Sequence, residues 1–409
     1  MIAKLRPLYP HVFQSIPGTI LHHEVNLQLK EGITPVFRGP RVVSIPLRGP
    51  TEAALQKLVA EGKLEKCSPG PWGTPIVPVL KSNKEVRVCG DYSITLNPGL
   101  NITGRRTPLI DDLSTVEGGW FCLVDMNQAY LQLKLSRTSQ ELCKINTPFG
   151  SFRWTHMPYG ISAGPAIFQE VISSILAGIE KTFIYLVDVL IWDTTQEGCE
   201  RRLHQVLKRP EENHVTLNVP KSHFLVPSVT YLGFLIDRHG LRADPSRMDE
   251  LLKKPSPRTF PELKSFIGMI TFYHKCGEAL STVLHPLYEL QKKSTWAWGR
   301  EEEAAFRKAL TLVNDSILVP YSLSRPLRLT ADASDVGAGC VISHVTDSGE
   351  EQPIAFASKK FSETELRYPV HEREAAALVF GLQKFSKYLE GREFEIVTDN
   401  KPLAAIFGD

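Results

Sequence analysis

The run Phe183-Ile-Tyr-Leu-Val-Asp188-Val-Leu-Ile-Trp192 is almost wholly apolar and is interrupted by a single carboxylate. A second run of the same kind, Trp120-Phe-Cys-Leu-Val-Asp125, ends on an aspartate. Short apolar runs of this length predict buried strands. An ionised aspartate in a buried strand is costly unless it is paired or bound to a metal ion. Asp125 and Asp188 are therefore the first candidate site residues.

Helical and strand-like patterns alternate on both sides of these two runs. The predicted elements are a helix over residues 51–64, a strand over 76–80, helices that begin at the caps Asp244 and Thr259, a strand over 327–332, a helix over 371–390 and a strand over 394–399. Short elements of both kinds in this order predict an α+β protein.

Composition limits the class of protein. The chain has 409 residues, of which 42% are hydrophobic and 22% charged, so it is long enough for two or three domains and is neither disordered nor fibrous. The net charge is only +2, which gives weak support for a nucleic-acid partner. Basic clusters at 81–84 and 105–106 suit phosphate contacts, and each is equally well explained as a solvated face.

The cysteines and the N-terminus bear on location. Seven cysteines, an odd number without a C-x-x-C pair, argue against a disulfide framework and a zinc ribbon and favour a reducing compartment. The first residues include Lys4, Arg6 and Pro7, where a signal peptide needs an apolar run, and no stretch approaches membrane-spanning length. We expect a soluble, intracellular protein without a membrane partner.

Two aspartates on separate buried strands suit phosphoryl transfer. A polymerase joins a nucleotide to a primer end by in-line attack on phosphorus, with divalent ions that activate the hydroxyl and neutralise the phosphates. Magnesium prefers rigidly held oxygen ligands, which Asp125 and Asp188 would provide. The alternative for each residue alone is a buried aspartate satisfied by backbone donors.

Six segments, in order along the chain, resemble reverse transcriptases of gypsy-type LTR retrotransposon polyproteins. Phe121-Cys-Leu-Val-Asp-Met-Asn-Gln-Ala-Tyr130 is similar to their first catalytic strand, and Tyr185-Leu-Val-Asp188 to their Y-x-D-D turn. The others are Arg87-Val-Cys-Gly-Asp-Tyr-Ser-Ile-Thr-Leu-Asn97, Met157-Pro-Tyr-Gly-Ile-Ser-Ala-Gly-Pro-Ala-Ile-Phe-Gln169, Tyr231-Leu-Gly-Phe234 and Phe266-Ile-Gly-Met-Ile-Thr-Phe-Tyr273. The resemblance implies a right-hand polymerase with fingers, palm and thumb.

The resemblance also implies roles for individual residues. Asp125 and Asp188 would bind Mg²⁺, two ions per active site, with Mn²⁺ as the alternative ion. Tyr130 would exclude the ribose 2′-hydroxyl, although core packing explains it as well. Arg87 and Lys81 would hold the triphosphate, for which a solvated hairpin is the alternative. The remaining implied positions are Tyr159 and Gly160 at the nucleotide pocket, and Tyr231, Leu232, Gly233 and Phe234 at the primer.

The sequence departs from the family pattern at three positions. Val187 stands where the family has an aspartate that binds both ions, so the resemblance implies the loss of a ligand and of useful activity. Ser93 replaces a usual arginine. Pro210 is expected to interrupt the helix that follows the Y-x-D-D turn.

A second set of carboxylates lies near the C-terminus: Asp332, Glu374 and Asp399. Glu374 lies four residues before Leu378, the first residue of the apolar helical stripe. Glu374 therefore points near the buried face of the helix, whereas Glu372 does not. The segments 330–339, 368–378 and 398–403 resemble the ribonuclease H of the same elements. The resemblance implies three carboxylates that bind two Mg²⁺ ions and hydrolyse RNA in an RNA–DNA hybrid, in a domain truncated at its C-terminus.

These observations predict four parts: an N-terminal arm and the start of the fingers over 1–70, fingers and palm over 71–236, a thumb and connection over 237–300, and a ribonuclease H-like α/β domain over 301–409. The first hypothesis is an RNA-directed DNA polymerase that takes an RNA template, a DNA primer and dNTPs. The alternative is a catalytically inactive nucleic-acid-binding relic, which Val187 favours. Ribonuclease H activity alone, on RNA–DNA hybrids, is a third.

Overall fold

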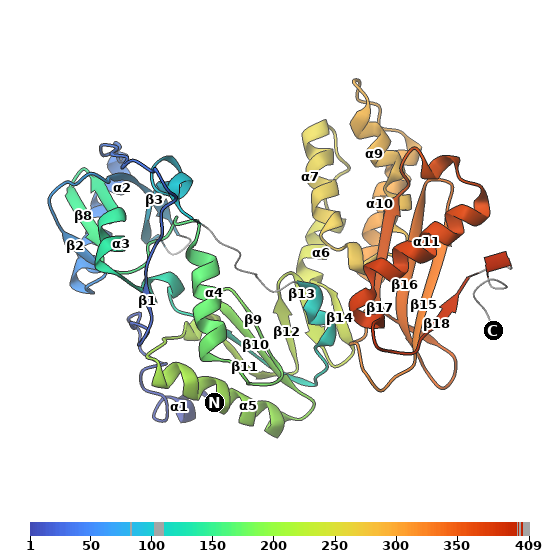
Figure 1. Ribbon diagram of the computed structural model, residues 1–409, viewed down its shortest axis with the longest axis horizontal. Helices are drawn as coiled ribbons and strands as arrows, with labels where there is room; N and C mark the ends of the chain where they lie inside the picture. Colours follow the sequence, from blue (N-terminus) through green and yellow to red (C-terminus); the bar gives the residue numbers. More distant parts are fainter. Residues whose placement is uncertain (82–83, 102–109, 399, 401, 404–409) are drawn as a thin grey trace. The chain divides into compact units, whose positions relative to one another are not determined.

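The computed structural model describes residues 1–81, 84–101, 110–398, 400 and 402–403 (Figure 1). The chain divides into two compact units, residues 1–109 with 121–226 and residues 110–120 with 227–409. The predicted four-part division is finer than these units and stays a prediction. Within the described ranges, no helix is long and apolar enough to cross a membrane.

The first unit is built from short helices and strands. Its elements are α1 (Ile2–Leu5), β1 (Glu24–Val25), α2 (Ile45–Ala60), β2 (Leu64–Lys66), β3 (Thr74–Leu80), β4 (Val86–Gly90), η1 (Tyr92–Ile94), η2 (Asn97–Gly99), β5 (Trp120–Asp125), η4 (Ala129–Gln132), β6 (Lys134–Leu135), α3 (Arg137–Leu142), β7 (Lys144–Thr147), β8 (Gly150–Trp154), α4 (Gly164–Ile175), β9 (Thr182–Tyr185), β10 (Asp188–Asp193), α5 (Gln196–Glu212), η5 (Val219–Lys221) and β11 (His223–Val226).

The second unit combines an antiparallel sheet and a mixed sheet with a group of helices. Its elements are η3 (Ile110–Thr115), β12 (Ser228–Tyr231), β13 (Phe234–Asp237), β14 (Gly240–Ala243), α6 (Pro245–Leu252), α7 (Phe260–Thr271), η6 (His274–Cys276), α8 (Leu280–Val283), α9 (His285–Lys292), α10 (Arg300–Asp315), β15 (Leu327–Ala333), β16 (Gly337–Val345), β17 (Glu351–Lys360), η7 (Glu365–Arg367), α11 (Val370–Lys384), α12 (Ser386–Leu389) and β18 (Glu395–Val397).

The two apolar runs that contain Asp125 and Asp188 lie in a four-stranded sheet of the first unit, whose strand order is β11-β5-β10-β9. The run over 120–125 is the predicted strand, β5. The single strand expected over 183–192 is wrong, because β9 and β10 form a hairpin in which Tyr185 pairs with Asp188. Its two-residue turn, Leu186–Val187, separates the strands, and the turn that the family resemblance implied is confirmed.

Helix α5 covers the four-stranded sheet and continues through Pro210, so the expected interruption is wrong. Figure 1 shows this helix running along the sheet. Pro210 lies near the C-terminal end of α5, where a missing N–H removes one hydrogen bond and little of the helix follows it. The buried stripe that includes Leu203 and Val206 fixes the helix on the sheet.

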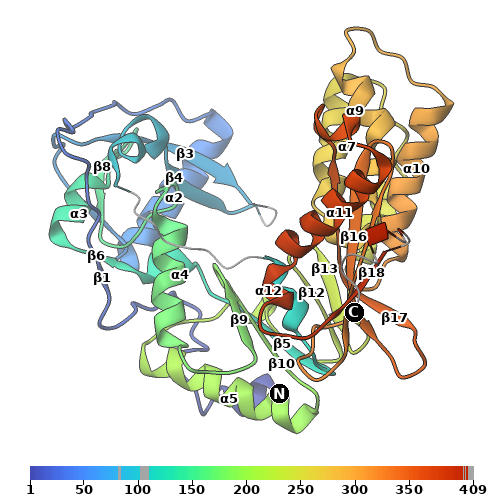
Figure 2. The same cartoon turned by 45° about the vertical axis from the view of Figure 1, so that its right-hand side comes forward.

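A second sheet of the first unit has the order β2-β8-β7-β3-β4 and packs against α2 (Figure 2). The helix expected over 51–64 begins earlier, at Ile45, because Pro46 is tolerated in a first turn. It ends at Ala60, and Gly62 follows with a φ of +69°, which favours glycine. Leu64 therefore belongs to strand β2.

The second unit confirms the predicted helix caps. The Asp244 carboxylate accepts a hydrogen bond from Ser246 N at 3.0 Å, and α6 begins at the next residue, Pro245. Thr259 Oγ1 accepts one from Glu262 N at 3.4 Å at the start of α7. These side chains satisfy backbone donors that the first turn of a helix leaves unpaired.

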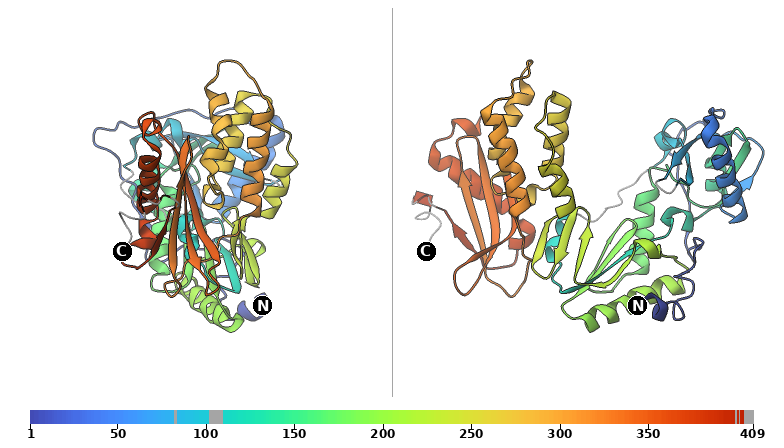
Figure 3. Two further views of the ribbon diagram at one scale, coloured as in Figure 1. Left: turned by 90° about the vertical axis from the view of Figure 1, so that its right-hand side faces the viewer. Right: turned by 180° about the vertical axis from the view of Figure 1, so that it is seen from behind.

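The C-terminal sheet has the order β17-β16-β15-β18, with β18 parallel to β15. Helix α11 packs on one face and α8 on the other, and Figure 3 shows the sheet between helices. The helix expected over 371–390 is two helices, α11 and α12, which meet at the buried Phe385. Strand β15 matches the prediction over 327–332 closely.

Candidate active site

Asp125 and Asp188 meet at one edge of the four-stranded sheet. Asp125 is the last residue of β5 and Asp188 the first of β10, and these strands are neighbours. Met126 N donates to Val187 O at 2.9 Å, which fixes the turn beside the end of β5. The two carboxyl groups are hydrogen-bonded to each other. The structure thus brings the two sequence-predicted aspartates into direct contact.

The carboxyl pair resists ionisation. Burial, together with the neighbouring charge and hydrogen bond of Asp125, raises the pKa of Asp188 to about 6 against the opposing charge of Lys221. Burial also raises the pKa of Asp125, whereas Lys221 and the Asn218 side chain lower it. One proton is therefore shared by the pair near pH 6. Two adjacent carboxylates repel each other when both are ionised, and a bound cation would relieve this repulsion.

Gln169 holds the turn between β9 and β10, a role that sequence reasoning did not assign. Leu186 has a φ of +54°, a costly conformation for a side chain other than glycine. The buried Gln169 Oε1 accepts a hydrogen bond from Leu186 N at 2.5 Å. Its Nε2 donates to Ile184 O at 3.0 Å. The available signal was an amide on the otherwise apolar buried face of α4.

The segment before β11 supports Asp125, and sequence reasoning also missed it. Asn218 N donates to Asp125 O at 2.8 Å. Asp125 N donates to Ser222 Oγ at 3.1 Å. Lys221 supplies the nearby positive charge. No carboxylate or apolar run marks this segment, so nothing in its composition separates it from an ordinary loop.

A cavity of about 1030 Å³ in the first unit is lined by several candidate residues, but not by Asp188 or Gly160. Its lining includes Asp125 and Tyr130 from the end of β5 onward, Lys81 and Arg87 from the β3–β4 hairpin, and Tyr159. Residues implied separately for metal, triphosphate and sugar binding therefore line one space. The volume is ample for a nucleotide-sized ligand.

Tyrosine rings and an arginine shape one wall of this cavity. Tyr130 meets Tyr159 edge-on at 5.8 Å and Phe168 at 5.9 Å between ring centroids. The exposed Arg87 guanidinium lies 4.7 Å from the centroid of the Tyr159 ring, a cation–π arrangement. Burial raises the pKa of Tyr159 to about 12, so its hydroxyl stays protonated. Both readings of Tyr130, packing and pocket lining, are compatible with these contacts.

Gly160 has a constrained backbone, and Lys81 has a partly exposed side chain. Gly160 has a φ of +100°, and a Cβ there would come within 2.5 Å of Gly90 O, so only glycine fits. Lys81 pairs with Glu85 at 3.4 Å on the hairpin. An ion pair of this length at the surface is weak, and the ammonium is available to an anionic ligand.

Val187 lines the same cavity in place of a carboxylate. Its backbone oxygen fixes the turn, and its side chain offers no atom that could bind a metal ion. The local fold is retained without the acidic residue because the turn depends on main-chain contacts and Gln169. The oxygen donors at this edge are thus two carboxylates.

The four primer-contact candidates form a hairpin turn in the second unit. Tyr231 pairs with Phe234, and the turn residues Leu232 and Gly233 have φ values of +49° and +82°. Tyr231, Gly233 and Phe234 are buried, and Leu232 is partly exposed. Contact with a ligand can come only from Leu232 and the turn backbone.

The second carboxylate set is described in part. Glu374 is buried and Glu372 exposed, which confirms the predicted orientation of α11. Asp332 is exposed near the end of β15. Asp399 lies outside the described residues. Across the described ranges, no three His, Cys, Asp or Glu side chains lie close enough together to hold a metal ion.

Two family models match the chain. Residues 97–236 match reverse transcriptase (RNA-dependent DNA polymerase), and residues 322–409 match the RNase H-like domain found in reverse transcriptase. A retrovirus-related Pol polyprotein from transposon opus of Drosophila melanogaster is 26% identical over 98% of this chain and 42% of its own length. The Tf2-3 transposon polyprotein of Schizosaccharomyces pombe is 28% identical over 80% and 25%. The chain spans less than half of these relatives.

Solved structures share the fold. A foamy viral protease-reverse transcriptase in complex with double-stranded DNA has a TM-score of 0.87 at 22% identity, over 99% of this chain and 86% of that one. The same viral protein with an RNA/DNA hybrid has a TM-score of 0.82 at 23% identity, over 98% and 55%. The predicted α+β right-hand fold with a ribonuclease H-like domain is confirmed.

Proposed function

We propose that this chain, which matches the reverse transcriptase model over residues 97–236 and the RNase H-like model over residues 322–409, is an RNA-directed DNA polymerase. It would bind an RNA template, a DNA primer and dNTPs. One observation carries the proposal: the cavity of about 1030 Å³ is lined at once by Asp125, Arg87, Tyr130 and Tyr159. The complexes of the foamy viral neighbours with DNA and an RNA/DNA hybrid support nucleic acid as the partner.

Asp125 and Asp188 are the proposed Mg²⁺ ligands. Their carboxylates are hard oxygen donors in mutual contact, and the chemistry of this pair fits one divalent ion that also takes phosphate oxygens and water. Such an ion would neutralise the phosphates and lower the pKa of the attacking hydroxyl. The role of Asp125 and Asp188 is to place two negative charges side by side. A second ion has less support, because Val187 supplies no donor.

The other cavity residues, and Gly160 next to Tyr159, have proposed roles toward the nucleotide. Arg87 and Lys81 would bind the triphosphate, and the Tyr159 ring beneath Arg87 would orient the guanidinium. Tyr130 would block a ribose 2′-hydroxyl with its ring. Gly160 would let the backbone approach the base pair closely, since no side chain fits there.

We also propose that the turn at Leu232 and Gly233 contacts the primer backbone, between the buried Tyr231 and Phe234. In the RNase H-like domain, Asp332, Glu374 and Asp399 are the proposed Mg²⁺ ligands for cleavage of RNA in a hybrid. The buried Glu374 on α11 supports this assignment. We propose also that the chain derives from a gypsy-type element and acts inside the cell.

A second candidate function is binding of template and primer without nucleotide addition. Val187 favours it, because a metal site that has lost a ligand shared by both ions loses transition-state stabilisation more than it loses substrate binding. Under either function the cavity is intact and binds template, primer and dNTP. The two candidate functions differ only in whether the bound nucleotide is then added to the primer.

The test of occupancy is a binding measurement. A fluorescent RNA-template/DNA-primer duplex with a dideoxy primer end is titrated with the full chain in Mg²⁺, with and without the next complementary dNTP. We expect the correct dNTP to tighten the complex, and a noncomplementary dNTP to leave it unchanged. Arg87→Ala should weaken the dNTP effect about tenfold or more, since one charge-assisted contact is worth ~1.5–3 kcal/mol.

Arg238→Ala, at an exposed arginine of the second unit, is the matched control and should behave as the unchanged protein. A duplex that binds equally with any dNTP, or with none, would show that the cavity does not select a nucleotide.

A further inference from the structure

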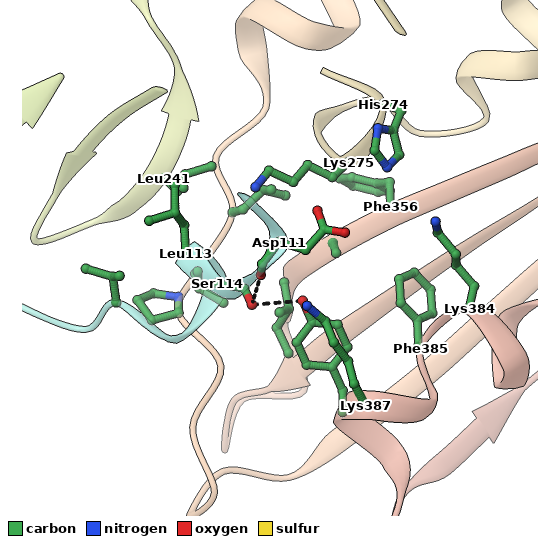
Figure 4. A pocket seen from close by; sticks show the side chains of 17 residues that line it. Asp111, Leu113, Ser114, Leu241, His274, Lys275, Phe356, Lys384, Phe385 and Lys387 are labelled. Atoms are coloured by element: carbon green, nitrogen blue, oxygen red, sulfur yellow. Dashed lines mark hydrogen bonds between the residues drawn. The ribbon is translucent and has the colours of Figure 1, made fainter. Parts of the chain in front are cut away.

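The second unit contains a small cavity bounded by η3, β14, η6, β17 and the junction of α11 with α12 (Figure 4). Its volume is about 30 Å³, room for roughly two water molecules. Apolar side chains such as Leu113, Leu241 and Phe385 form much of the wall. A space of this size admits a compact group of a few atoms and excludes a nucleotide.

Positive charge gathers around this cavity. Lys275 comes from η6, Lys384 from the end of α11 and Lys387 from α12, and Figure 4 shows them reaching the cavity from different sides. The described part of the lining holds a single carboxylate, Asp111. Lys387 also lies 3.6 Å from Asp112. Three ammonium groups against two carboxylates leave a positive excess.

Lys275 is the decisive group. It is only 6% exposed, and among the described residues no carboxylate lies within ion-pair distance of its ammonium. Its Nζ donates to Ile110 O at a long 3.4 Å and lies 4.4 Å from the centroid of the Phe234 ring. The charge of Asp111 favours the ammonium of Lys275 without forming an ion pair with it, so the lost hydration of this group is compensated only in part. An anion in the cavity would supply a direct partner.

We propose that this cavity binds one phosphate group, held by Lys275, Lys384 and Lys387. A tetrahedral oxyanion matches three lysines that approach from three directions, since each ammonium is a point charge without a fixed plane. The small volume limits the bound part to the phosphate itself. The site is separate from the nucleotide cavity of the first unit and does not depend on polymerase activity.

The Asp111 carboxylate would compete with a bound phosphate for the three lysines. It lines the cavity among the lysines, and Figure 4 shows its carboxylate between Lys275, Lys384 and His274. Removing its charge should therefore strengthen phosphate binding, an effect opposite to that of removing a lysine. The opposite signs distinguish an anion site from a merely structural cluster, in which both changes would only destabilise the fold.

The experiment is titration of inorganic phosphate into the full chain at constant ionic strength, read by broadening of the phosphate ³¹P NMR signal and by thermal unfolding. We expect binding by the unchanged protein, about tenfold weaker binding by Lys384→Gln and Lys387→Gln, and tighter binding by Asp111→Asn. The two lysines are exposed, so these variants should fold. Lys254→Gln, another exposed lysine of the same unit, is the matched control.

A short oligonucleotide added at saturation identifies the source of the phosphate. Displacement of inorganic phosphate assigns the site to a nucleic-acid phosphate, and retained broadening assigns it to free phosphate. The proposal is overturned if phosphate binds no better than chloride to both the unchanged protein and Asp111→Asn, or if the Lys384→Gln/Lys387→Gln double variant binds it undiminished.

Discussion

At the scale of single residues, the site depends on a few groups held in unfavourable states. Asp125 and Asp188 share a proton near pH 6 because burial and mutual repulsion oppose two charges. Leu186 keeps a left-handed backbone because Gln169 binds its N–H. Such strain persists only where the surrounding structure holds it. The sequence predicted the aspartates from their apolar context, whereas the strain at Leu186 has no local signature.

The raised pKa of Asp188, about 6, predicts a pH dependence. A carboxyl whose folded pKa exceeds its unfolded value destabilises the fold when ionised, so the stability of the metal-free protein should change little between pH 8 and 7 and should rise as the pH falls through 6 towards 5. Mg²⁺ needs the ionised pair, so its stabilising effect should fade over the same range. Thermal unfolding at pH 5 to 8, with and without Mg²⁺, measures both.

Asp188→Asn should abolish the Mg²⁺ effect, and Asp347→Asn, at an exposed aspartate, should keep it. An Mg²⁺ effect that is independent of pH, or unchanged in Asp188→Asn, would contradict the assignment of this pair.

Gly160 allows a second test at this scale. Gly160→Ala adds a Cβ within 2.5 Å of Gly90 O at a φ of +100°, so we expect a loss of about 2–4 kcal/mol in unfolding free energy. Gly178 has a φ of +80° and open space around its Cβ position, so Gly178→Ala should cost only ~1 kcal/mol. Urea unfolding compares the two. Equal losses would show that the close approach at Gly160 is relaxed easily.

At the scale of elements, contacts between segments decide what patterns along the chain cannot. The run over 183–192 is almost uniformly apolar, so its pattern does not mark a turn. The hairpin within it depends on the pairing of Tyr185 with Asp188. Pro210 breaks a rule for isolated helices, yet α5 continues because its buried stripe packs on the sheet. The helix caps at Asp244 and Thr259 were predicted correctly, since a cap is a local arrangement.

Gln169 links α4 to the hairpin turn, so we expect its replacement to lower both the stability of the fold and the selectivity for dNTPs. Gln169→Leu removes the acceptor for Leu186 N and the donor to Ile184 O, so we expect about 1–3 kcal/mol of destabilisation. Dideoxy-terminated primer complexes should also lose dNTP selectivity, because the turn carries Val187 and leads into Asp188. Ser173→Ala, which removes a neighbouring contact of Gln169 while leaving both bonds to the turn, is the control. Unchanged dNTP selectivity in Gln169→Leu would show that the turn keeps its shape without this amide.

At the scale of the whole molecule, the order of motifs carried more information than any single motif. Composition and charge alone indicated a globular protein, and a net charge of +2 hardly suggested nucleic acid. The fold and family followed from six segments in sequence, whereas Asn218 and Lys221 escaped notice because they contribute through position rather than pattern. The phosphate cavity was equally invisible, since Asp111, Lys275 and Lys384 are distant in sequence.

The central claim is that the chain retains a polymerase site whose chemistry is limited at Val187. Single-turnover primer extension on an RNA template with Mg²⁺ tests it, comparing the unchanged protein with Val187→Asp and with Val187→Asp/Asp125→Asn. We expect Val187→Asp to extend primers at least a hundredfold faster than the unchanged protein, a difference of ~2.7 kcal/mol, and the double variant to be inactive. Rapid extension by the unchanged protein, or none by Val187→Asp despite normal duplex and dNTP binding, would contradict the claim.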